Sequence, residues 1–339
     1  MRSIRIGMMG LGQVGRQIYM LALQDARFEV VAISDIGQPE ILCHLLNKAL
    51  GKNGVVQLED NYLVSESCRT RLMSSVRPTE IPWDVFDTDF VIDTTGRYRS
   101  LAELSPHLAN GAKRVVISTL PEDEIDRVIL CGVNDDQAHI DDRIISAGSA
   151  STTAAALALK VISESYQIEH ASMTSVHAYT SDQSLQDYAG ADYRRSRSGA
   201  ENIIPNATPA LQWIQKLLPS LNGRMTAYAL NVPVQTGSML DLTVVLTEPF
   251  EGVSAVTELF VEAARANPAM IGTVNDPIVS SDVKGDSHSL LVDLQGSMQA
   301  GSRMLKLLGW HETLGHAHRI LDVVASYDRL DIPDIQEVA

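Results

Sequence analysis

The first half of the chain alternates short apolar runs with longer amphipathic stretches, which is the pattern of successive βαβ units. The runs have the length and β-branched content of buried strands, and the stretches repeat their apolar residues at helical spacing. We therefore expect a parallel sheet with helices on its faces. The expected strands are Ile4–Met9, Glu29–Ser34, Phe90–Asp93, Arg114–Ser118, Val128–Val133 and Arg143–Ser146, and the expected helices are Val14–Gln24, Pro39–Asn47, Leu101–Asn110 and Ser151–Ser165.

The second half changes character, because its apolar and polar residues alternate over longer segments. This pattern predicts an α+β domain with a mainly antiparallel sheet. The expected strands are His170–Tyr179, Arg224–Val232, Leu240–Thr247 and Leu290–Asp293, and the expected helices are Thr208–Leu217 and Val253–Ala266. We divide the α/β chain into a first domain at 1–150, a second at 151–314 and a C-terminal helix at 315–339 that packs back on the first.

Composition narrows the function classes. The net charge of −15 argues against a nucleic-acid surface and against anionic membranes. No apolar run reaches the roughly 18 residues of a membrane span, and the N-terminus lacks a signal sequence, so we expect a cytoplasmic protein with no membrane partner. Cys43, Cys68 and Cys131 are scattered, which predicts neither a metal site nor a disulfide framework.

A glycine-rich turn lies between the first expected strand and the first expected helix. It reads Gly10-Leu11-Gly12-Gln13-Val14-Gly15, and such glycines let the backbone approach a pyrophosphate at a helix N-terminus. Asp35 closes the next strand twenty positions after Gly15, where a carboxylate binds adenosine ribose hydroxyls. An aspartate there repels the 2′-phosphate of NADP, and no arginine follows it. The motif predicts a Rossmann-type domain that binds NAD.

Several further segments resemble the glyceraldehyde-3-phosphate dehydrogenase family, in the family's order and along nearly the whole chain. The most specific is Met173-Thr174-Ser175-Val176-His177-Ala178, which resembles the segment with the family's catalytic histidine. The others are Ile6-Gly7-Met8-Met9-Gly10-Leu11-Gly12, Asp93-Thr94-Thr95-Gly96, Gly111-Ala112-Lys113, Cys131-Gly132-Val133-Asn134 and Asn202-Ile203-Ile204-Pro205.

The resemblance implies a mechanism and an assembly. In the family a cysteine thiolate attacks a small phosphorylated aldehyde, a histidine acts as base, hydride passes to NAD, and phosphate or water cleaves the thioester. A homotetramer is implied, with an S-shaped loop reaching a neighbouring subunit. The implied cofactor-binding residues are Gly10, Gly12, Gln13, Val14, Gly15, Asp35, Arg77, Thr95, Gly96 and Ser118, and His177 is the implied base.

The nucleophile is missing. By the resemblance the cysteine position falls on Ala150, twenty-seven positions before His177, at the start of an expected helix. Either the alanine was introduced by design or the protein naturally lacks the thiol; we favour design, because so much of the surrounding site is retained. Ser151 would need a shift of one position to replace the cysteine, and serine lacks the low pKa of a thiol.

The implied anion pocket is partly retained. Its expected residues are Ser149, Ser151, Thr180, Asp182, Arg195, Arg197 and Thr208, although the arginines also fit an ordinary solvated charge run. Three features depart from the family. Asn231 stands where the family has an arginine, Pro209 replaces a glycine and has no N–H, and the segment Trp310–Gly315 lacks an asparagine that holds nicotinamide.

Two classes of function therefore compete. The first is NAD-dependent oxidation of a small aldehyde, including an erythrose-4-phosphate dehydrogenase branch that Asp286-Ser287-His288-Ser289 resembles. The second is an NAD-binding scaffold or sensor that has lost the chemistry. The natural codon at position 150 distinguishes them, since a cysteine favours the enzyme and an alanine the scaffold.

Overall fold

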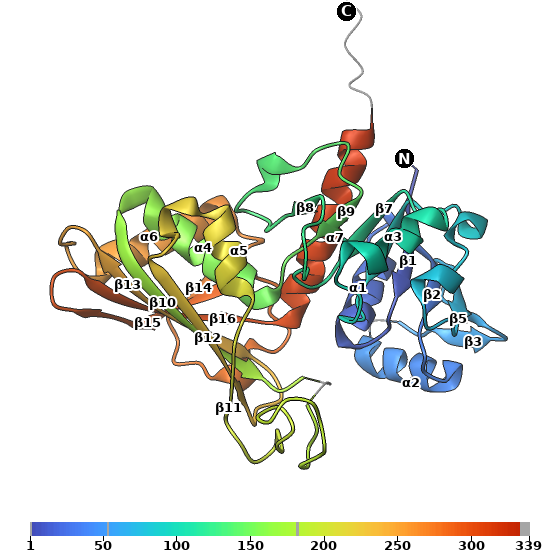
Figure 1. The fold of residues 1–339 in the computed structure, drawn as a ribbon, viewed down its shortest axis with the longest axis horizontal. Coiled ribbons are helices and arrows are strands. Elements are labelled where there is room, and N and C mark those ends of the chain that lie inside the picture. Colours follow the sequence, from blue (N-terminus) through green and yellow to red (C-terminus); the bar gives the residue numbers. More distant parts are fainter. Residues whose placement is uncertain (1, 53, 181–182, 333–339) are drawn as a thin grey trace, which may run out of the picture. The chain divides into compact units, whose positions relative to one another are not determined.

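The computed structural model describes residues 2–52, 54–180 and 183–332 (Figure 1). The chain forms two compact units, Met1–Ser149 with Ala317–Ala339, and Ala150–His316. Among the described residues, no helix is long and apolar enough to cross a membrane.

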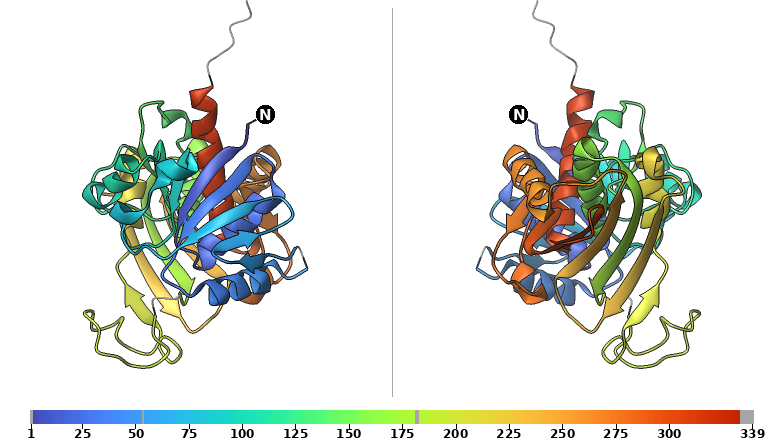
Figure 2. Two further views of the ribbon diagram at one scale, coloured as in Figure 1. Left: turned by 90° about the vertical axis from the view of Figure 1, so that its right-hand side faces the viewer. Right: turned by 90° about the vertical axis from the view of Figure 1, so that its left-hand side faces the viewer.

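The first unit is built on a nine-stranded sheet in the order β3-β4-β5-β2-β1-β6-β7-β9-β8. All neighbouring strands from β5 to β8 pair in parallel, whereas β3, β4 and β5 form an antiparallel edge. The strands are β1 Ile4–Met9, β2 Phe28–Ser34, β3 Gln57–Glu59, β4 Tyr62–Val64, β5 Arg69–Met73, β6 Phe90–Asp93, β7 Arg114–Ile117, β8 Arg127–Val128 and β9 Ile144–Ser146. The α-helices between them are α1 Gln13–Gln24, α2 Pro39–Leu50 and α3 Leu101–Ala109, and Figure 2 (left) shows the parallel strands face on.

The C-terminal helix α7, Thr313–Asp331, packs against the first unit from Ala317 onward. Ile320 and Val324 are fully buried, and the hydroxyl of Tyr327 donates to the carboxylate of Asp142 at 2.7 Å. At the end of the helix, Asp331 accepts from the guanidinium of Arg114. Apolar burial and charged hydrogen bonds together hold the helix in place.

Two expected strands were wrong in their length. The strand predicted at Leu290–Asp293 continues to Ala300. The segment predicted as Val128–Val133 ends as a strand at Val128. Gly132 takes a positive φ of 82°, and the side chain of Asn134 accepts from the N–H of Leu130 and donates to the carbonyl of Val128. The asparagine satisfies backbone groups that a ladder would otherwise pair, so an apolar run here forms a turn.

The second unit contains a seven-stranded sheet in the order β11-β12-β10-β13-β16-β15-β14. It is mostly antiparallel, with parallel pairing of β10 to β12 and of β14 to β15. Helices α4, α5 and α6 cover one of its faces (Figure 1). The elements are α4 Ala150–Ser165, β10 Ile168–Ala178, β11 Ile204–Asn206, α5 Ala210–Leu217, β12 Met225–Val232, β13 Ser238–Leu246, α6 Val253–Ala266, β14 Ile271–Val274, β15 Leu290–Ala300 and β16 Met304–His311.

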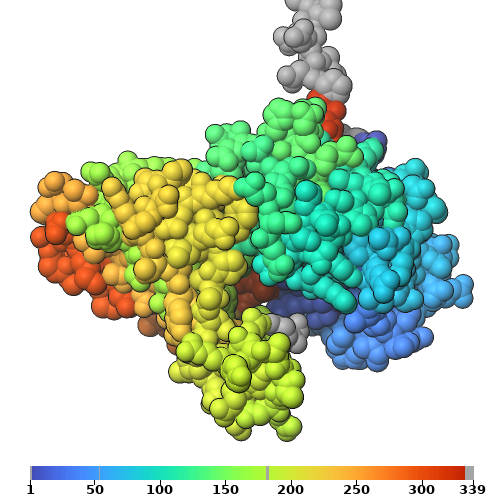
Figure 3. Space-filling view, viewed as in Figure 1, coloured from blue at the N-terminus to red at the C-terminus, as the bar shows by residue number. Residues whose placement is uncertain are grey.

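A long loop joins β10 to β11. Its described part, residues 183–203, extends away from the strands as a lobe of its own (yellow-green in Figures 2 and 3). The loop is held by its own polar contacts, in which Asp187 accepts from the N–H of Ser198 and pairs with Arg197 at 2.9 Å. Several large apolar side chains remain exposed on it, namely Leu185, Tyr188, Tyr193 and Ile203.

The glycine turn after β1 leaves no room for side chains at one position. A Cβ added to Gly15 would lie 2.4 Å from the carbonyl oxygen of Gly10, whereas one added to Gly12 would meet nothing within 4 Å. Helix α1 therefore packs directly on the turn through Gly15.

This contrast makes a prediction. Gly15→Ala should lower the free energy of unfolding by about 1–3 kcal/mol, because the new methyl group meets an immobile backbone oxygen. Gly12→Ala, the matched control, should lose less than about 1 kcal/mol, the usual cost of alanine at a helix N-cap. Urea unfolding of both variants is the measurement; equal losses would show that the turn is not sterically closed at Gly15.

Candidate functional site

The first half of the site is the carboxyl edge of the parallel sheet. The carboxylate of Asp35, after β2, accepts from the N–H of Leu11 at 2.6 Å and of Gly37 at 2.7 Å. Gly10 takes a φ of +94°, and no side chain caps the start of α1. Because Gly12 is exposed and open space lies in front of it, the helix start can accept a phosphate group.

The end of β6 lies beside this turn. The hydroxyl of Thr94 donates to the carbonyl of Gly10 at 2.9 Å, and Asp93 accepts from the N–H of Thr95 at 2.8 Å. At the end of β7, the N–H of Ser118 donates to the carbonyl of Asp93 at 3.0 Å. The structure thus brings together three segments that the sequence singled out: the glycine turn, Thr95–Gly96 and Ser118. Arg77 is exposed at the start of the 3₁₀ turn Pro78–Glu80.

In the second unit, Ala150 is the first residue of α4, and Ser151 behind it is buried. The helix start could stabilise a thiolate or an oxyanion, but no thiol is at this position. Cys43, Cys68 and Cys131 all lie in the first unit, and burial raises the thiol pKa of both Cys43 and Cys131. Neither of these two thiols has the low pKa of a catalytic cysteine.

His177 lies near the end of β10, in register with Asn231 of the neighbouring strand β12. The hydroxyl of Ser175, on the same face of the strand, is hydrogen bonded to its Nε2 at 3.0 Å. His311 on β16 packs edge to face against the ring of His177, with the ring centroids 5.7 Å apart. The sheet register explains the contact, because His311 pairs with Ser238 at the start of β13, and the next residue of β13, Met239, pairs with Val176, the neighbour of His177.

Burial keeps both rings uncharged. It lowers the pKa of His177, and burial together with the neighbouring His177 and His316 lowers the pKa of His311 to about 3. At neutral pH His177 is therefore in the form that accepts a proton. His311 was not predicted from the sequence, since a histidine near the end of an unassigned strand gives no periodic signal, and only the register places it beside His177.

Asn231 is the centre of an amide network. Its Oδ1 accepts from Nδ2 of Asn206 on β11, and its own Nδ2 donates to Oε1 of Gln183 at 2.9 Å. The same Gln183 oxygen accepts from the N–H of Thr180 at 3.1 Å. At the position of the expected phosphate-binding arginine, the chain thus has uncharged amides bonded to one another.

The remaining expected anion residues are only partly assembled. The hydroxyl of Thr208 accepts from the N–H of Ala210 at 3.2 Å and so supports the start of α5, where Pro209 offers no N–H. Arg197 is paired with Asp187 within the loop. Ser149 is half-buried just before α4, Arg195 is exposed on the loop, and Asp182 lies outside the described residues.

The segment without the expected asparagine is fixed by Glu312. This carboxylate accepts from the N–H of Gly237 at 2.8 Å and of Thr313 at 3.2 Å, and so joins the end of β16 to the turn before β13. Nearby, Asp286 accepts from the N–H of His288 at 2.8 Å, and the carbonyl of His288 lies against Gly315. Both motifs have structural contacts within the second unit.

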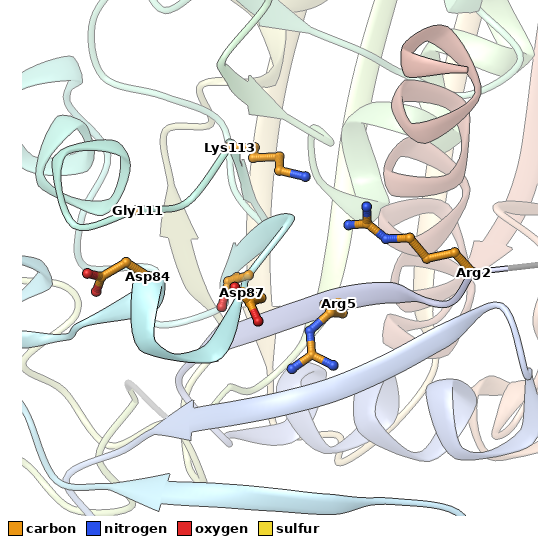
Figure 4. Close-up of a pocket in the computed structure, with 7 residues that line it drawn as sticks. Arg2, Arg5, Asp84, Asp87, Gly111 and Lys113 are labelled. Carbon is orange, nitrogen blue, oxygen red and sulfur yellow. The ribbon is translucent and has the colours of Figure 1, made fainter. Parts of the chain in front are cut away.

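A separate pocket of about 520 Å³ lies at the opposite edge of the first sheet, near the amino ends of β1, β6 and β7 (Figure 4). Its cations already have partners: Arg2 and Lys113 pair with Asp89, and Arg5 pairs with Glu29. The pocket therefore does not lie at the carboxyl edge of the sheet, where the glycine turn is (the cofactor edge), and its cations are not free to bind an anion.

Comparison with known proteins matches most of the chain to one protein family. Residues 4–101 match a model described as glyceraldehyde 3-phosphate dehydrogenase, NAD binding domain, and residues 149–313 match one described as its C-terminal domain. Three glyceraldehyde-3-phosphate dehydrogenases align over nearly the whole chain. Those of Mycobacterium avium, Streptomyces coelicolor and Bacillus subtilis are 36%, 37% and 32% identical, each over 95% of this chain and 97–98% of their own length.

The chain belongs to the glyceraldehyde-3-phosphate dehydrogenase family. The family assignment confirms the resemblance, the two-sheet α/β fold and NAD as the cofactor. Two features of the first unit suit a dinucleotide. The uncapped start of α1 suits its phosphate groups, and the carboxylate of Asp35 suits its ribose hydroxyls. NAD supplies the acceptor of a hydride when it is bound.

The buried histidines of this family member predict acid sensitivity. The unfolded chain binds a proton at His311 below about pH 6.5, and the folded chain does not until about pH 3, so stability falls as pH falls through this range. Between pH 6.5 and 5 the loss from His311 amounts to about 2 kcal/mol. His311→Gln should weaken the pH dependence of the urea midpoint, because the variant has no imidazole to protonate at this buried position. An unchanged slope in His311→Gln would contradict the burial argument.

Proposed function

We propose that this chain has the architecture for NAD-dependent oxidation of a small aldehyde through a thioester, and that it is inactive because Ala150 occupies the nucleophile position. The observation that carries the proposal is the pair of elements retained around the missing thiol. Ala150 is the first residue of α4. His177, whose imidazole is uncharged, is the last residue but one of β10 in the same unit. We also propose a cytoplasmic location.

The proposed roles follow from ordinary acyl chemistry. A cysteine at position 150 would lose its proton to His177, and its thiolate would add to the aldehyde carbon. N–H groups at the start of α4 would stabilise the oxyanion of the hemithioacetal. Loss of hydride to NAD would leave a thioester, which phosphate or water would cleave. With alanine at position 150 the first bond cannot form.

Ala150→Cys should therefore create NADH formation with short aldehydes, where the unmodified chain gives almost none. Removing such a nucleophile costs several orders of magnitude in rate. Iodoacetamide should label the new thiol, and adding His177→Ala should slow labelling near neutral pH. Ser151→Cys is the matched control, because it places a thiol one residue further into the helix, where the side chain is buried.

The outcome that contradicts the proposal is an Ala150→Cys variant that is folded and binds NAD but shows neither labelling nor NADH formation. Activity in Ser151→Cys that equals activity in Ala150→Cys would also contradict the assignment of the nucleophile position.

We propose further that glyceraldehyde 3-phosphate is not the preferred substrate. A buried phosphate dianion needs charge-assisted partners, and an arginine supplies two strong bonds where an amide supplies one weaker donor. Asn231 has both of its polar atoms engaged with Asn206 and Gln183, which leaves capacity for a neutral hydroxyl rather than for a dianion. Pro209 also has no N–H to offer to an anion, where the family has a glycine.

Asn231→Arg in the Ala150→Cys background tests this. We expect kcat/KM for glyceraldehyde 3-phosphate to rise by about one to two orders of magnitude, the usual value of a charged hydrogen bond. A panel of aldehydes that are longer or not phosphorylated should be assayed as well, and kcat/KM for the best of them should fall. Thr226→Arg adds the same charge at an exposed position of β12 and should change neither. Efficient use of the triose phosphate before the change, with loss after it, would contradict the proposal.

We propose a homotetramer, as in the family resemblance. The exposed apolar side chains of the loop between β10 and β11 support it, since monomers rarely leave such a set uncovered. Light scattering at micromolar concentration should give about four times the mass of the chain. Tyr193→Asp, at a residue that is 97% exposed, should weaken the assembly without unfolding the chain, and a stable monomer before any change would contradict the proposal.

The second candidate, an NAD-binding scaffold or sensor, is favoured by one observation. The chain has no nucleophile at Ala150 and no arginine at Asn231, and Pro209 offers no N–H to an anion. The amide of Asn231 is instead hydrogen bonded to Asn206 and Gln183. A natural codon for alanine at position 150 would support this candidate, and a natural cysteine codon would support the enzyme.

A further inference from the structure

Three buried side chains from separate segments meet in the interior of the first unit, at the end of β6. Trp83, in the 3₁₀ turn Trp83–Phe86, and His107, on α3, are fully buried, and Asp93 is 2% exposed. The indole N–H of Trp83 donates to Nδ1 of His107 at 2.9 Å. Nε2 of His107 lies 3.6 Å from Oδ2 of Asp93, whose Oδ1 accepts from the N–H and hydroxyl of Thr95 at 2.8 and 2.6 Å.

The indole decides which nitrogen of His107 carries the proton. Trp83 can only donate a hydrogen bond, so Nδ1 must accept, and the ring hydrogen of the neutral imidazole is then on Nε2. This hydrogen faces the carboxylate of Asp93. The indole ring is itself held in place, because it packs on Gly7 of β1 so closely that an added Cβ would lie 2.5 Å from it.

The facing atoms have no other partner. Within the described part of the chain, neither Nε2 of His107 nor Oδ2 of Asp93 makes a hydrogen bond, and both are buried. A carboxylate with one unpaired oxygen in the interior is costly, and the imidazole N–H is the donor placed to offset that cost. The 3.6 Å separation is too short for a bridging water and slightly too long for a direct bond.

The carboxylate is the link to the cofactor edge. Asp93 Oδ1 fixes Thr95, and the hydroxyl of Thr94 donates to the carbonyl of Gly10 in the glycine turn. We propose that His107 is a positioning residue for the cofactor loop Thr94–Gly96, acting through Asp93. The inference rests on the cofactor role that the family resemblance gives to Thr95 and Gly96. His107 orients the carboxylate, the carboxylate fixes Thr95, and the loop is ordered before the dinucleotide binds.

Calorimetric titration with NAD tests this on the unmodified chain and on His107→Leu, which removes both bonding atoms. We expect the Kd for NAD to rise about tenfold in His107→Leu, because the buried carboxylate loses the N–H that faces its Oδ2. His107→Gln, whose amide can accept from Trp83 and donate to Asp93, should restore the Kd to within about threefold. Leu104→Ala, at another fully buried residue of α3, should lower the melting temperature without changing the Kd.

A double-mutant cycle tests the route through Asp93. Asp93→Asn alone should weaken NAD binding, and adding His107→Leu should weaken it little further, because the two residues act in series. If His107→Leu does not fold, His107→Met, which also has no N–H to face the carboxylate, takes its place in the cycle.

The results separate this inference from the proposed function. Absence of NAD binding by the unmodified chain would contradict the cofactor edge itself. Normal NAD binding that is unchanged in His107→Leu, or equally weakened in His107→Gln and Leu104→Ala, would overturn the role of His107. Fully additive losses in the cycle would overturn the route through Asp93.

Discussion

Carboxylates at the ends of β2 and β6 hold the loops of the cofactor edge, and the rest of that edge depends on them. Backbone N–H groups in such loops need acceptors, because no ladder or helix pairs them. Asp35 accepts from Leu11 and Gly37, and Asp93 accepts from Thr95. A dinucleotide bound at this edge would meet loops that are already fixed by the protein, which would reduce the ordering cost of binding.

In the second unit, the side chains around His177 and Asn231 are mostly uncharged. Where β10 and β12 end, the interacting groups include imidazoles, amides and a hydroxyl, and burial favours the uncharged form of the imidazoles of His177 and His311. Such an edge can accept a proton at His177 and bind neutral oxygens. It has no fixed positive charge at Asn231 for a phosphate, so charge for an anionic substrate would have to come from elsewhere.

The sequence predicted the fold class well, because buried parallel strands and amphipathic helices leave strong periodic signals. Strand β6 and helix α6 begin and end where they were expected. The pattern overestimated the strand predicted at Val128–Val133, where the side chain of Asn134 replaces ladder bonds. It also missed strands β3–β5, β11, β14 and β16, which are short or flanked by polar turns.

For the site, the glycine motif identified the turn and the family resemblance identified His177, but contacts between distant segments left no trace in one sequence. The ring of His311 reaches His177 only through the register of β13 with β10 and β16. The pairing of Asn231 with Asn206 and Gln183 likewise follows from strand order. Local sequence patterns predict the helices and strands, whereas the pairing of the strands determines which side chains meet.

The central claim is that Asp35 and the glycine turn form an edge built for NAD. Calorimetric titration of the unmodified chain with NAD and NADP tests it most directly. A carboxylate at the ribose position should weaken NADP binding at least about tenfold relative to NAD, or about 1.4 kcal/mol. Micromolar NAD binding with that preference is the predicted result, and equal affinities or no NAD binding would contradict the account.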